Sequence, residues 1–259
     1  MFASFAGTHA IVTAGTLGIG RGIVDQLLTS GSNVSVCART SSGLQEIKER
    51  YPDRVYIEEV DLFDPQNTEA FAVRAVEHWG GKVNHLFYNA PHLPKGGISN
   101  LSVDDWQRAY AGIYVSMVSA IGAVLPAMVK ANGGSIVIIS SLSAVEPIAE
   151  LALSSVLRGG LPAYVKLLAR KYGQNNIRIN AVLPGYTDTA IMRQSAQQVA
   201  DDEGKSVDEI LMRWAKPTAL GRLGKPEEIA NVALFLSSSY ASYVTGSTVL
   251  VDGGYVQGV

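Results

Sequence analysis

The segment Thr13-Ala14-Gly15-Thr16-Leu17-Gly18-Ile19-Gly20 decides how this chain is expected to fold. It follows a short apolar β-type run, His9 to Thr13, and precedes an amphipathic helical pattern from Arg21 to Ser30. Glycines between a strand and a helix let the backbone approach a pyrophosphate, and the helix N-terminus offers it unpaired N–H groups. The segment therefore predicts a dinucleotide site at the first turn of an α/β sheet.

Strand and helix patterns alternate along the rest of the chain. We expect further strands at Val34–Ala38, Val55–Val60, Val83–Tyr88, Ile136–Ile139, Ile177–Leu183 and Thr248–Val251. The expected helices are Gly43–Arg50, Asn67–Trp79, Val103–Lys130, Leu151–Tyr172, 190–203, 206–215 and Pro226–Ser237. Apolar strands in repeated β-α-β units predict a doubly wound parallel sheet of Rossmann type, with about seven strands and helices on both faces. Because no linker or repeat interrupts the pattern, residues 1–259 are expected to form a single domain.

Composition narrows the class of protein. The 259 residues are 47% apolar and carry a net charge of -2, which fits a folded chain and gives no basis for a nucleic-acid surface. No membrane span and no secretory signal are evident. Cys37 is the single cysteine, and no Cys/His cluster has zinc spacing, so neither a disulfide nor a metal is expected. We expect a cytoplasmic protein with a small-molecule substrate.

Further motifs follow the glycine turn in a fixed order. They are Asp61-Leu62, Asn89-Ala90, Ser140-Ser141, Pro184-Gly185-x-x-x-Thr189, the run Gly221 to Ala230, Tyr243-Val244-Thr245-Gly246 and Val251-Asp252-Gly253-Gly254. Together with the turn, this order resembles the short-chain dehydrogenase/reductase family over essentially the whole chain. The resemblance implies a nicotinamide cofactor and a homodimer or homotetramer formed through the two long helices.

The resemblance also assigns residues to the cofactor. It implies that Gly15, Thr16, Gly18, Ile19 and Gly20 surround the pyrophosphate, and that Asp61 and Leu62 meet the adenine. Asn89 and Ala90 would line the ribose side, and Pro184, Gly185, Thr187 and Thr189 would hold the nicotinamide carboxamide. Taken alone, Asp61 could equally cap the end of a strand. Ala14 departs from the family, which usually has a glycine there, and Ala enters a left-handed conformation at a cost of about 1 kcal/mol.

The end of the second expected strand bears on which nicotinamide cofactor binds. NAD-preferring relatives carry an acid there for the adenosine 2′-hydroxyl, whereas this chain has Cys37-Ala38-Arg39-Thr40-Ser41. Arg39 and the neighbouring hydroxyls suit a 2′-phosphate instead. We therefore expect NADP(H); the alternative is that Arg39 is a solvated surface side chain.

The catalytic positions implied by the family are altered. Ser141 matches the usual serine, but Ser154 stands where a tyrosine is expected, Arg158 replaces the lysine, and Ile113 falls at the helical asparagine. A serine lacks the tunable phenol, and an arginine does not lose its proton at working pH. Arg158 can still hold a ribose, a carboxylate or an oxyanion. The pattern resembles a divergent subgroup whose members are similar to 3-oxoacyl-carrier-protein reductases but lack the full tetrad.

Other side chains could supply the missing proton. The candidates are Tyr114, His92, Glu146, Glu150 and Tyr186, although a structural role is expected for each one. Residues 190 to 216 are expected to cover the substrate, and their apolar side chains either form a lid or simply pack on the body. Those that could form the lid are Ile191, Met192, Val199, Ile210, Leu211, Met212 and Trp214.

Three functions remain open at this point. The first is an NADP(H)-dependent oxidoreductase acting on a carbonyl, an alcohol or an activated double bond of a small, apolar or bulky substrate. In it, Ser141, Ser154 or Arg158 would polarise the substrate and water would deliver the proton. The second is a non-redox cyclase, isomerase or lyase on the same scaffold. The third is a catalytically silent cofactor-binding protein, because fold analogy does not fix function.

Overall fold

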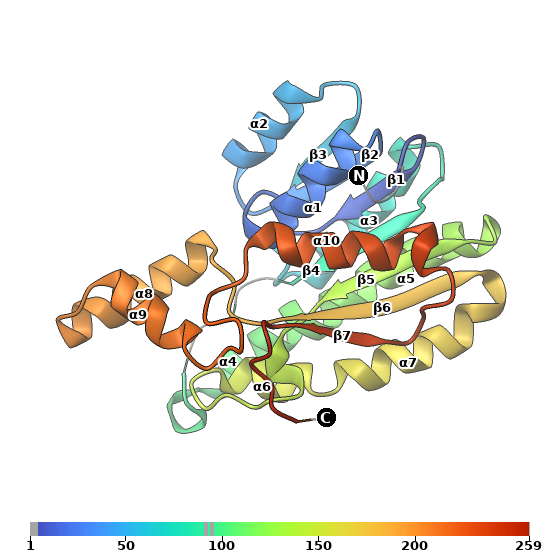
Figure 1. The fold of residues 1–259 in the computed structure, drawn as a ribbon. Coiled ribbons are helices and arrows are strands. Elements are labelled where there is room, and N and C mark those ends of the chain that lie inside the picture. The colour runs from blue at the N-terminus through green and yellow to red at the C-terminus, as the bar shows by residue number, and fades with distance from the viewer. Residues whose placement is uncertain (1–4, 91–92, 94–95, 259) are drawn as a thin grey trace.

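The computed structural model describes residues 5–90, 93 and 96–258, and in this part of the chain seven parallel strands form one sheet (Figure 1). The strand order is β3-β2-β1-β4-β5-β6-β7, so the chain winds outward from the centre in both directions. The predicted doubly wound α/β fold is therefore confirmed. The strands are β1 (His9–Val12), β2 (Asn33–Ala38), β3 (Val55–Glu59), β4 (His85–Asn89), β5 (Gly134–Ile139), β6 (Ile177–Pro184) and β7 (Thr248–Val251).

The sheet is buried on both faces because its side chains alternate between two cores. On β1, Ile11 packs in one core, while Ala10 and Val12 pack in the other. The core around Val12 is closed by α1 (Gly18–Thr29), α2 (Ser41–Arg50) and α10 (Pro226–Ser237). The core around Ile11 is closed by α3 (Pro65–His78), α5 (Ser116–Lys130) and α7 (Leu161–Tyr172).

Two expected helices are interrupted in the structure. The stretch from Val103 to Lys130 consists of α4 (Val103–Tyr110), a π-helical turn (Ala111–Val115) and α5. By length and composition it could cross a membrane, but half of its most apolar window is buried, as in a core helix. The expected helix Leu151–Tyr172 is divided into α6 (Ala152–Arg158) and α7. Gly159-Gly160 and Pro162 explain the division, because glycine favours a break and proline suits the first turn of a new helix.

The helix after the glycine turn begins earlier than expected, at Gly18 rather than Arg21. The glycines Gly18 and Gly20 therefore lie inside the first turn of α1, where they bring its N-terminus directly to the end of β1. Cys37 is fully buried on β2, and burial raises the pKa of its thiol to about 12. The cysteine is part of the core.

Candidate active site

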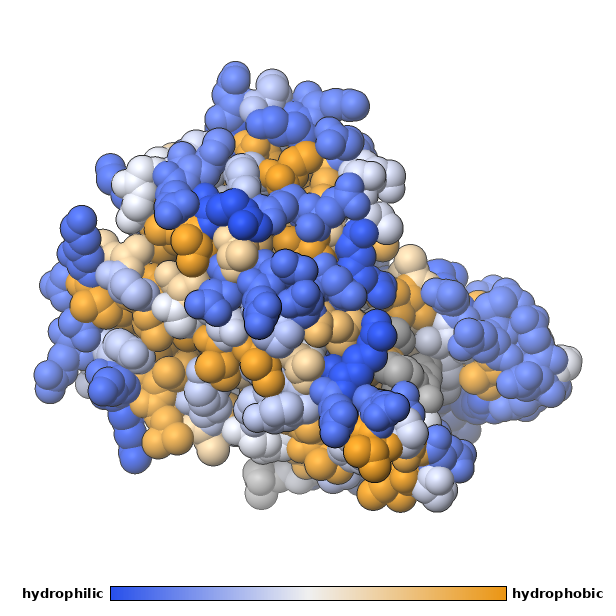
Figure 2. Space-filling model, turned by 180° about the vertical axis from the view of Figure 1, so that it is seen from behind, coloured by the Kyte–Doolittle hydropathy of each residue, from blue (hydrophilic) through white to orange (hydrophobic). Residues whose placement is uncertain are grey.

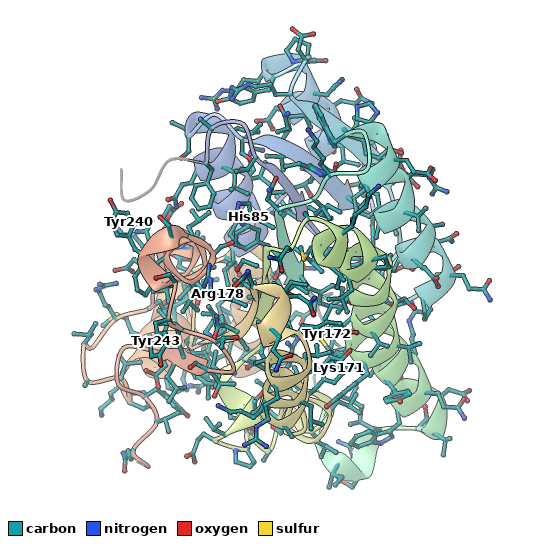
Figure 3. All side chains as sticks on the ribbon, turned by 90° about the vertical axis from the view of Figure 1, so that its right-hand side faces the viewer. His85, Lys171, Tyr172, Arg178, Tyr240 and Tyr243 are labelled. Atoms are coloured by element: carbon teal, nitrogen blue, oxygen red, sulfur yellow. The ribbon has the colours of Figure 1, made fainter. Side chains whose placement is uncertain are left out.

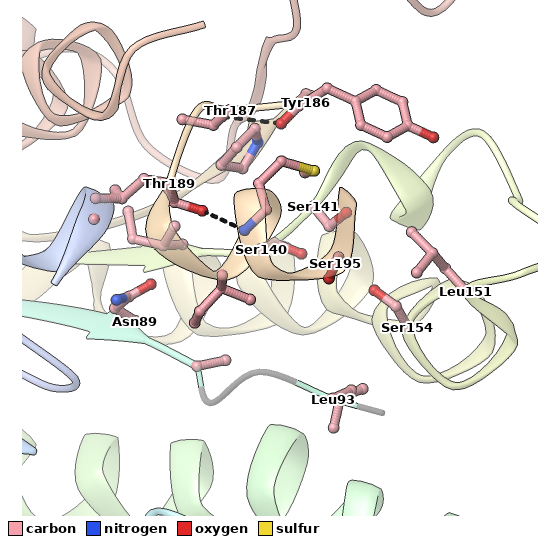
Figure 4. A pocket seen from close by; sticks show the side chains of 18 of the residues that line it. Asn89, Leu93, Ser140, Ser141, Leu151, Ser154, Tyr186, Thr187, Thr189 and Ser195 are labelled. Carbon is pink, nitrogen blue, oxygen red and sulfur yellow. Dashed lines mark hydrogen bonds between the residues drawn. The ribbon is translucent and has the colours of Figure 1, made fainter. Parts of the chain in front are cut away.

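A cavity of about 290 Å³ lies at the carboxyl ends of β1, β4, β5 and β6 (Figure 4). Ligands bind at this edge of open α/β sheets, where the strand order reverses. Eleven of the predicted site residues line it: Gly18, Ile19, Asn89, Ala90, Ser141, Ser154, Arg158, Pro184, Gly185, Thr187 and Thr189. Six others lie outside its lining: Gly15, Thr16, Gly20, Arg39, Asp61 and Leu62.

The glycine turn is strained at Ala14, the residue that departs from the family pattern. Ala14 adopts a left-handed φ of 47°, the conformation that favours glycine. The Asn89 side chain donates a 3.2 Å hydrogen bond to the Ala14 carbonyl, which holds the turn against the end of β4. A Cβ atom on Gly15 would approach Val36 to 2.6 Å, and one on Gly20 would collide with the Ala14 carbonyl. Gly15 and Gly20 thus allow the turn to close, whereas Gly18 and Ile19 reach the cavity.

The N-terminus of α1 opens into the cavity without a side-chain cap. Leu17 is the N-cap residue and accepts no capping bond, so N–H groups of the first turn remain available. These groups and the helix dipole favour an anion such as a pyrophosphate. Gly18, with a φ of 53°, lies against Thr189, whose methyl carbon would be 3.1 Å from a Cβ atom at this position. The arrangement fits the phosphate end of a dinucleotide.

The end of β2 also fits the expected cofactor. Arg39 is exposed immediately after the strand, and it takes part in none of the ion pairs found among the described residues. The following helix, α2, begins at Ser41, and its N-cap residue Thr40 makes no capping bond. Arg39, an exposed Ser41 and an uncapped helix start are all groups that suit a phosphate.

Asp61 and Leu62 have structural roles that the sequence left open. Asp61 accepts a 3.0 Å hydrogen bond from the Phe63 backbone, so it forms the turn after β3. Leu62 is buried in the core, and its carbonyl accepts a 2.6 Å bond from Ser116. An adenine ring could meet the exposed Asp61 and the backbone of Leu62, but not the Leu62 side chain.

Three serine hydroxyls form a connected row beside the cavity. Ser141 accepts bonds from both the backbone N–H of Ser143, at 3.2 Å, and the Ser143 hydroxyl, at 3.0 Å. The hydroxyls of Ser143 and Ser154 are 2.8 Å apart. Because Ser141 accepts twice, its own proton is free to point at a ligand. The altered centre therefore retains a hydroxyl donor that two further serines support.

Ser143 is a site residue that the sequence reasoning missed. It is fully buried and stands behind Ser141 and Ser154 rather than in the cavity wall. A signal was present, because Ser143 lies two residues after Ser141 in the run Ser140-Ser141-Leu142-Ser143. Ser140 was not predicted as a site residue, although it belongs to the Ser140-Ser141 motif. It lines the cavity, and its buried hydroxyl has no hydrogen-bond partner among the described residues.

Arg158 is the only charged side chain among the described residues that line the cavity. It is 8% exposed, and its closest polar contact is a 3.5 Å bond from Nη1 to the Ile139 carbonyl. Its buried Nε has no hydrogen-bond partner among the described residues. Burial lowers the pKa of the guanidinium to about 10, opposed by the nearby Tyr88, so it stays positive at neutral pH.

The apolar residue at the expected asparagine position is enclosed by other apolar side chains. Ile113 is buried in the π-helical turn and packs with Leu93, Ala109 and Leu153. The side chains of these four residues offer no polar group to hold a water molecule. Tyr114 is outside the cavity lining; its ring stacks on Tyr110, and burial raises the pKa of its hydroxyl.

The remaining proton-donor candidates differ in position. Tyr186 lines the cavity and stacks on Trp214, with 6.2 Å between the ring centroids. Burial raises the pKa of Tyr186 to about 12, so it is a weak acid at neutral pH. Glu146 and Glu150 are exposed and do not line the cavity. His92 lies outside the described residues.

The segment after β6 supplies the opposite wall. The Thr187 hydroxyl donates to the Gly185 carbonyl at 3.0 Å, and Thr189 accepts a bond from the Met192 backbone as the N-cap of α8 (Ala190–Glu203). Both hydroxyls therefore shape the loop and are already engaged (Figure 4). Backbone groups of this loop are engaged as well, because the N–H groups of Gly185 and Asp188 donate to the carbonyls of Val251 and Gly224.

The expected lid is partly a separate helical hairpin. The helices α8 and α9 (Val207–Ala215) project from the body (Figure 1). Ile191 and Met192 line the cavity, as a lid requires. Met212 is 63% exposed, which excludes it from a buried lid surface. The other lid candidates instead pack in the hairpin's own core, namely Val199, Ile210, Leu211 and Trp214.

The same described residues contain no group of three His, Cys, Asp or Glu side chains placed to hold a metal ion. The polar groups around the cavity are hydroxyls, amides, backbone N–H groups and one guanidinium. This donor set fits an anionic organic cofactor and a polar substrate group.

Comparisons with known proteins agree with the fold and the site. Residues 13–256 match the family model described as Enoyl-(Acyl carrier protein) reductase. A 3-oxoacyl-[acyl-carrier-protein] reductase of Chlamydia pneumoniae is 30% identical over 97% of this chain and 98% of its own. An L-rhamnose 1-dehydrogenase (NAD(P)(+)) of Sphingomonas sp. is 32% identical over 96% of each chain.

Solved structures extend the likeness. L-sorbose reductase from Gluconobacter frateurii, in complex with NADPH and L-sorbose, superposes with a TM-score of 0.93, is 28% identical and is covered over 100% of both chains. A variant of the actinorhodin polyketide ketoreductase, solved with NADPH, has a TM-score of 0.89 and 26% identity, over 97% of this chain and 98% of that one. Fold and site thus define an enzyme class of NAD(P)-dependent oxidoreductases. The chain belongs to the short-chain dehydrogenase/reductase family.

Proposed function

We propose that this protein is an NADP(H)-dependent reductase or dehydrogenase acting on a carbonyl, an alcohol or an activated double bond. The observation that carries the proposal is one cavity that joins the uncapped N-terminus of α1 to the hydroxyl of Ser141. A single site thereby combines a place for the cofactor's phosphates with a hydroxyl that can donate to the substrate. The NADPH complexes of similar reductases support the choice of cofactor.

Named residues would hold the cofactor. The first turn of α1 would bind the pyrophosphate, and Arg39 with the start of α2 would bind the 2′-phosphate. Asn89, Ala90 and Arg158 would face the ribose. The backbone from Pro184 to Thr189 would face the carboxamide, and Asp61 would lie beside the adenine. When bound, the cofactor supplies or accepts a hydride.

The proposed mechanism does not use a Tyr-Lys pair. For reduction, Ser141 donates a hydrogen bond to the carbonyl oxygen and passes its proton as negative charge develops there. Ser143 then returns a proton to Ser141, and Ser154 returns one to Ser143. Water at the cavity delivers the final proton to Ser154. Arg158 stabilises the developing oxyanion by its positive charge. This substitution of roles would place the chain in a divergent subgroup of the family.

The proposal also covers the cellular compartment, the domain organisation and the substrate contacts. The chain would act in the cytoplasm as a single domain, with residues 190–216 near the substrate. Ile191 and Met192, with Leu93 and Leu151, would contact an apolar or bulky part of that substrate.

A homodimer or homotetramer is also proposed, through α5 and α7. Apolar side chains on and near these helices reach the surface, and Figure 2 shows apolar side chains on the back face of the molecule. The exposed ones are Val118, Val129, Val156 and Leu167.

One experiment separates the three possible functions. Purified protein is incubated with NADPH deuterated at the transferred position and a panel of ketones and enones. Deuterium in the product supports the proposal. Turnover without cofactor oxidation supports a non-redox lyase, isomerase or cyclase instead. Tight NADPH binding without any turnover supports a silent binding protein. Parallel titration with NADPH and NADH tests the cofactor, and tighter binding of NADH would contradict the role of Arg39.

A further inference from the structure

Arg158 is a buried cation that has no counter-ion among the residues that the structure describes. No Asp or Glu is among the described residues that line the cavity, and none of the ion pairs found in them includes Arg158. Its one hydrogen bond, to the neutral Ile139 carbonyl, is 3.5 Å long. A buried charge is costly unless it is paired and hydrogen-bonded. Pairing with a negative group bound from outside would offset this cost.

The expected cofactor does not provide this negative charge. Its anionic groups are phosphates, which the start of α1 and Arg39 would bind. The ribose that would face Arg158 is neutral. Its hydroxyls can accept hydrogen bonds but leave the guanidinium charge uncompensated. The partner of Arg158 is thus better sought in the substrate.

We infer that the substrate carries a permanent anionic group, a carboxylate, which pairs with Arg158 next to the carbonyl or double bond that is reduced. This inference rests on the proposed function and names its substrate class. Guanidinium groups bind carboxylates through two parallel hydrogen bonds. In Arg158, Nη1 makes only the 3.5 Å bond and Nη2 has no partner among the described residues, so the Nη donors can form such a pair. The apolar walls formed by Leu93, Leu151 and Met192 would hold the rest of an oxo acid.

The test uses simple probes, because the natural substrate is not needed. Protein saturated with NADPH is titrated with benzoate and with benzamide, which have similar shapes but differ in charge. We expect benzoate to bind about 10- to 100-fold more tightly, the range for a charge-assisted pair. In Arg158→Met this preference should be lost, and in Arg158→Lys part of it should remain. The control is Arg170→Met, an exposed arginine on α7, which should keep the full preference.

The outcomes separate this inference from the proposed function. Equal affinities of the wild type for benzoate and benzamide would overturn the inference, as would an undiminished preference in Arg158→Met. NADPH binding is measured first by its own fluorescence, so a failure of the proposed cofactor role is seen before either probe is added. With a reducible substrate in hand, an oxo acid should also be turned over at least about tenfold more efficiently than its amide. The opposite order would contradict the inference.

Discussion

Two arginines differ in how well the fold satisfies their charge. The half-buried Arg178 lies where the strands begin, which we call the amino edge of the sheet, and the buried Arg158 lies where they end, the carboxyl edge. Arg178 lies near the amino end of β6, and its guanidinium donates to the carbonyls of Leu236, Ser237, Ser238, Ala241 and Val244. Arg158 lies at the carboxyl edge and has a single 3.5 Å bond. Figure 3 shows Arg178 close to His85, another group of the amino edge.

The different bonding of the two arginines indicates different roles for the amino edge and the carboxyl edge of the sheet. At the amino edge, Arg178 satisfies the carbonyls that end α10, as a cation at a helix C-terminus should. Buried polar atoms without partners among the described residues occur at both edges, on His85 and Ser135 at the amino edge and on Arg158 and Ser140 at the carboxyl edge. Only Arg158 and Ser140 also line the cavity. An unsatisfied polar group costs stability, and such costs are characteristic of functional sites. We conclude that Arg178 stabilises the fold at the amino edge, whereas Arg158 and Ser140 leave the cavity at the carboxyl edge ready for a ligand.

The largest expected effect is a loss of stability in acid. Burial lowers the pKa of His9 to about 4 and that of His85 to about 3. Both are therefore neutral in the folded state, while the unfolded chain binds protons below pH ~6.5. The free energy of unfolding should fall as the pH decreases from about 6.5 to 4.5, by about 2 kcal/mol per histidine.

Urea unfolding followed by circular dichroism at several pH values measures this loss. His9→Gln and His85→Gln should each show a smaller decrease over the same pH range than the wild type. An identical pH dependence in all three proteins would show that the amino edge does not hold neutral histidines.

The next effect concerns Arg178. Arg178→Met should lower the free energy of unfolding by about 3 kcal/mol, because several carbonyls lose a charged donor. NADPH affinity of the folded variant should stay within about twofold of the wild type, as the cavity is at the other edge. Urea unfolding and fluorescence titration provide the two values. A stable variant with impaired NADPH binding would reverse our assignment of the edges.

A smaller effect is expected for Ser143. Ser143→Ala removes the link between Ser141 and Ser154, and kcat should fall about tenfold with little change in KM, since the hydroxyl row acts during proton transfer. The solvent deuterium isotope effect on kcat should also change. Ser99→Ala, at an exposed serine outside the cavity lining, is the control. An unchanged kcat in Ser143→Ala would exclude the row from the reaction.

The sequence predicted most of the fold because apolar strands and the glycine turn carry local signals. It did not predict the helix break at Gly159-Gly160, because the apolar pattern continues through it. It also did not predict the π-helical turn, because no residue type is specific for such a turn. Most predicted residues at the strand ends line the cavity, because parallel strands bring these ends together. Ser143 was missed because its contact with Ser154 joins two elements. The lack of partners for Arg158 could not be predicted, because the groups that surround it come from strands and helices far apart in the sequence.

The most direct test of the contrast between the two arginines is the urea unfolding of Arg158→Met without any ligand. Replacing a buried, poorly paired charge by an apolar side chain is often neutral or stabilising. Our account predicts that the free energy of unfolding of Arg158→Met is within about 1 kcal/mol of the wild type or higher. A loss of about 3 kcal/mol, as expected for Arg178→Met, would contradict it, because Arg158 would then serve the fold rather than a ligand.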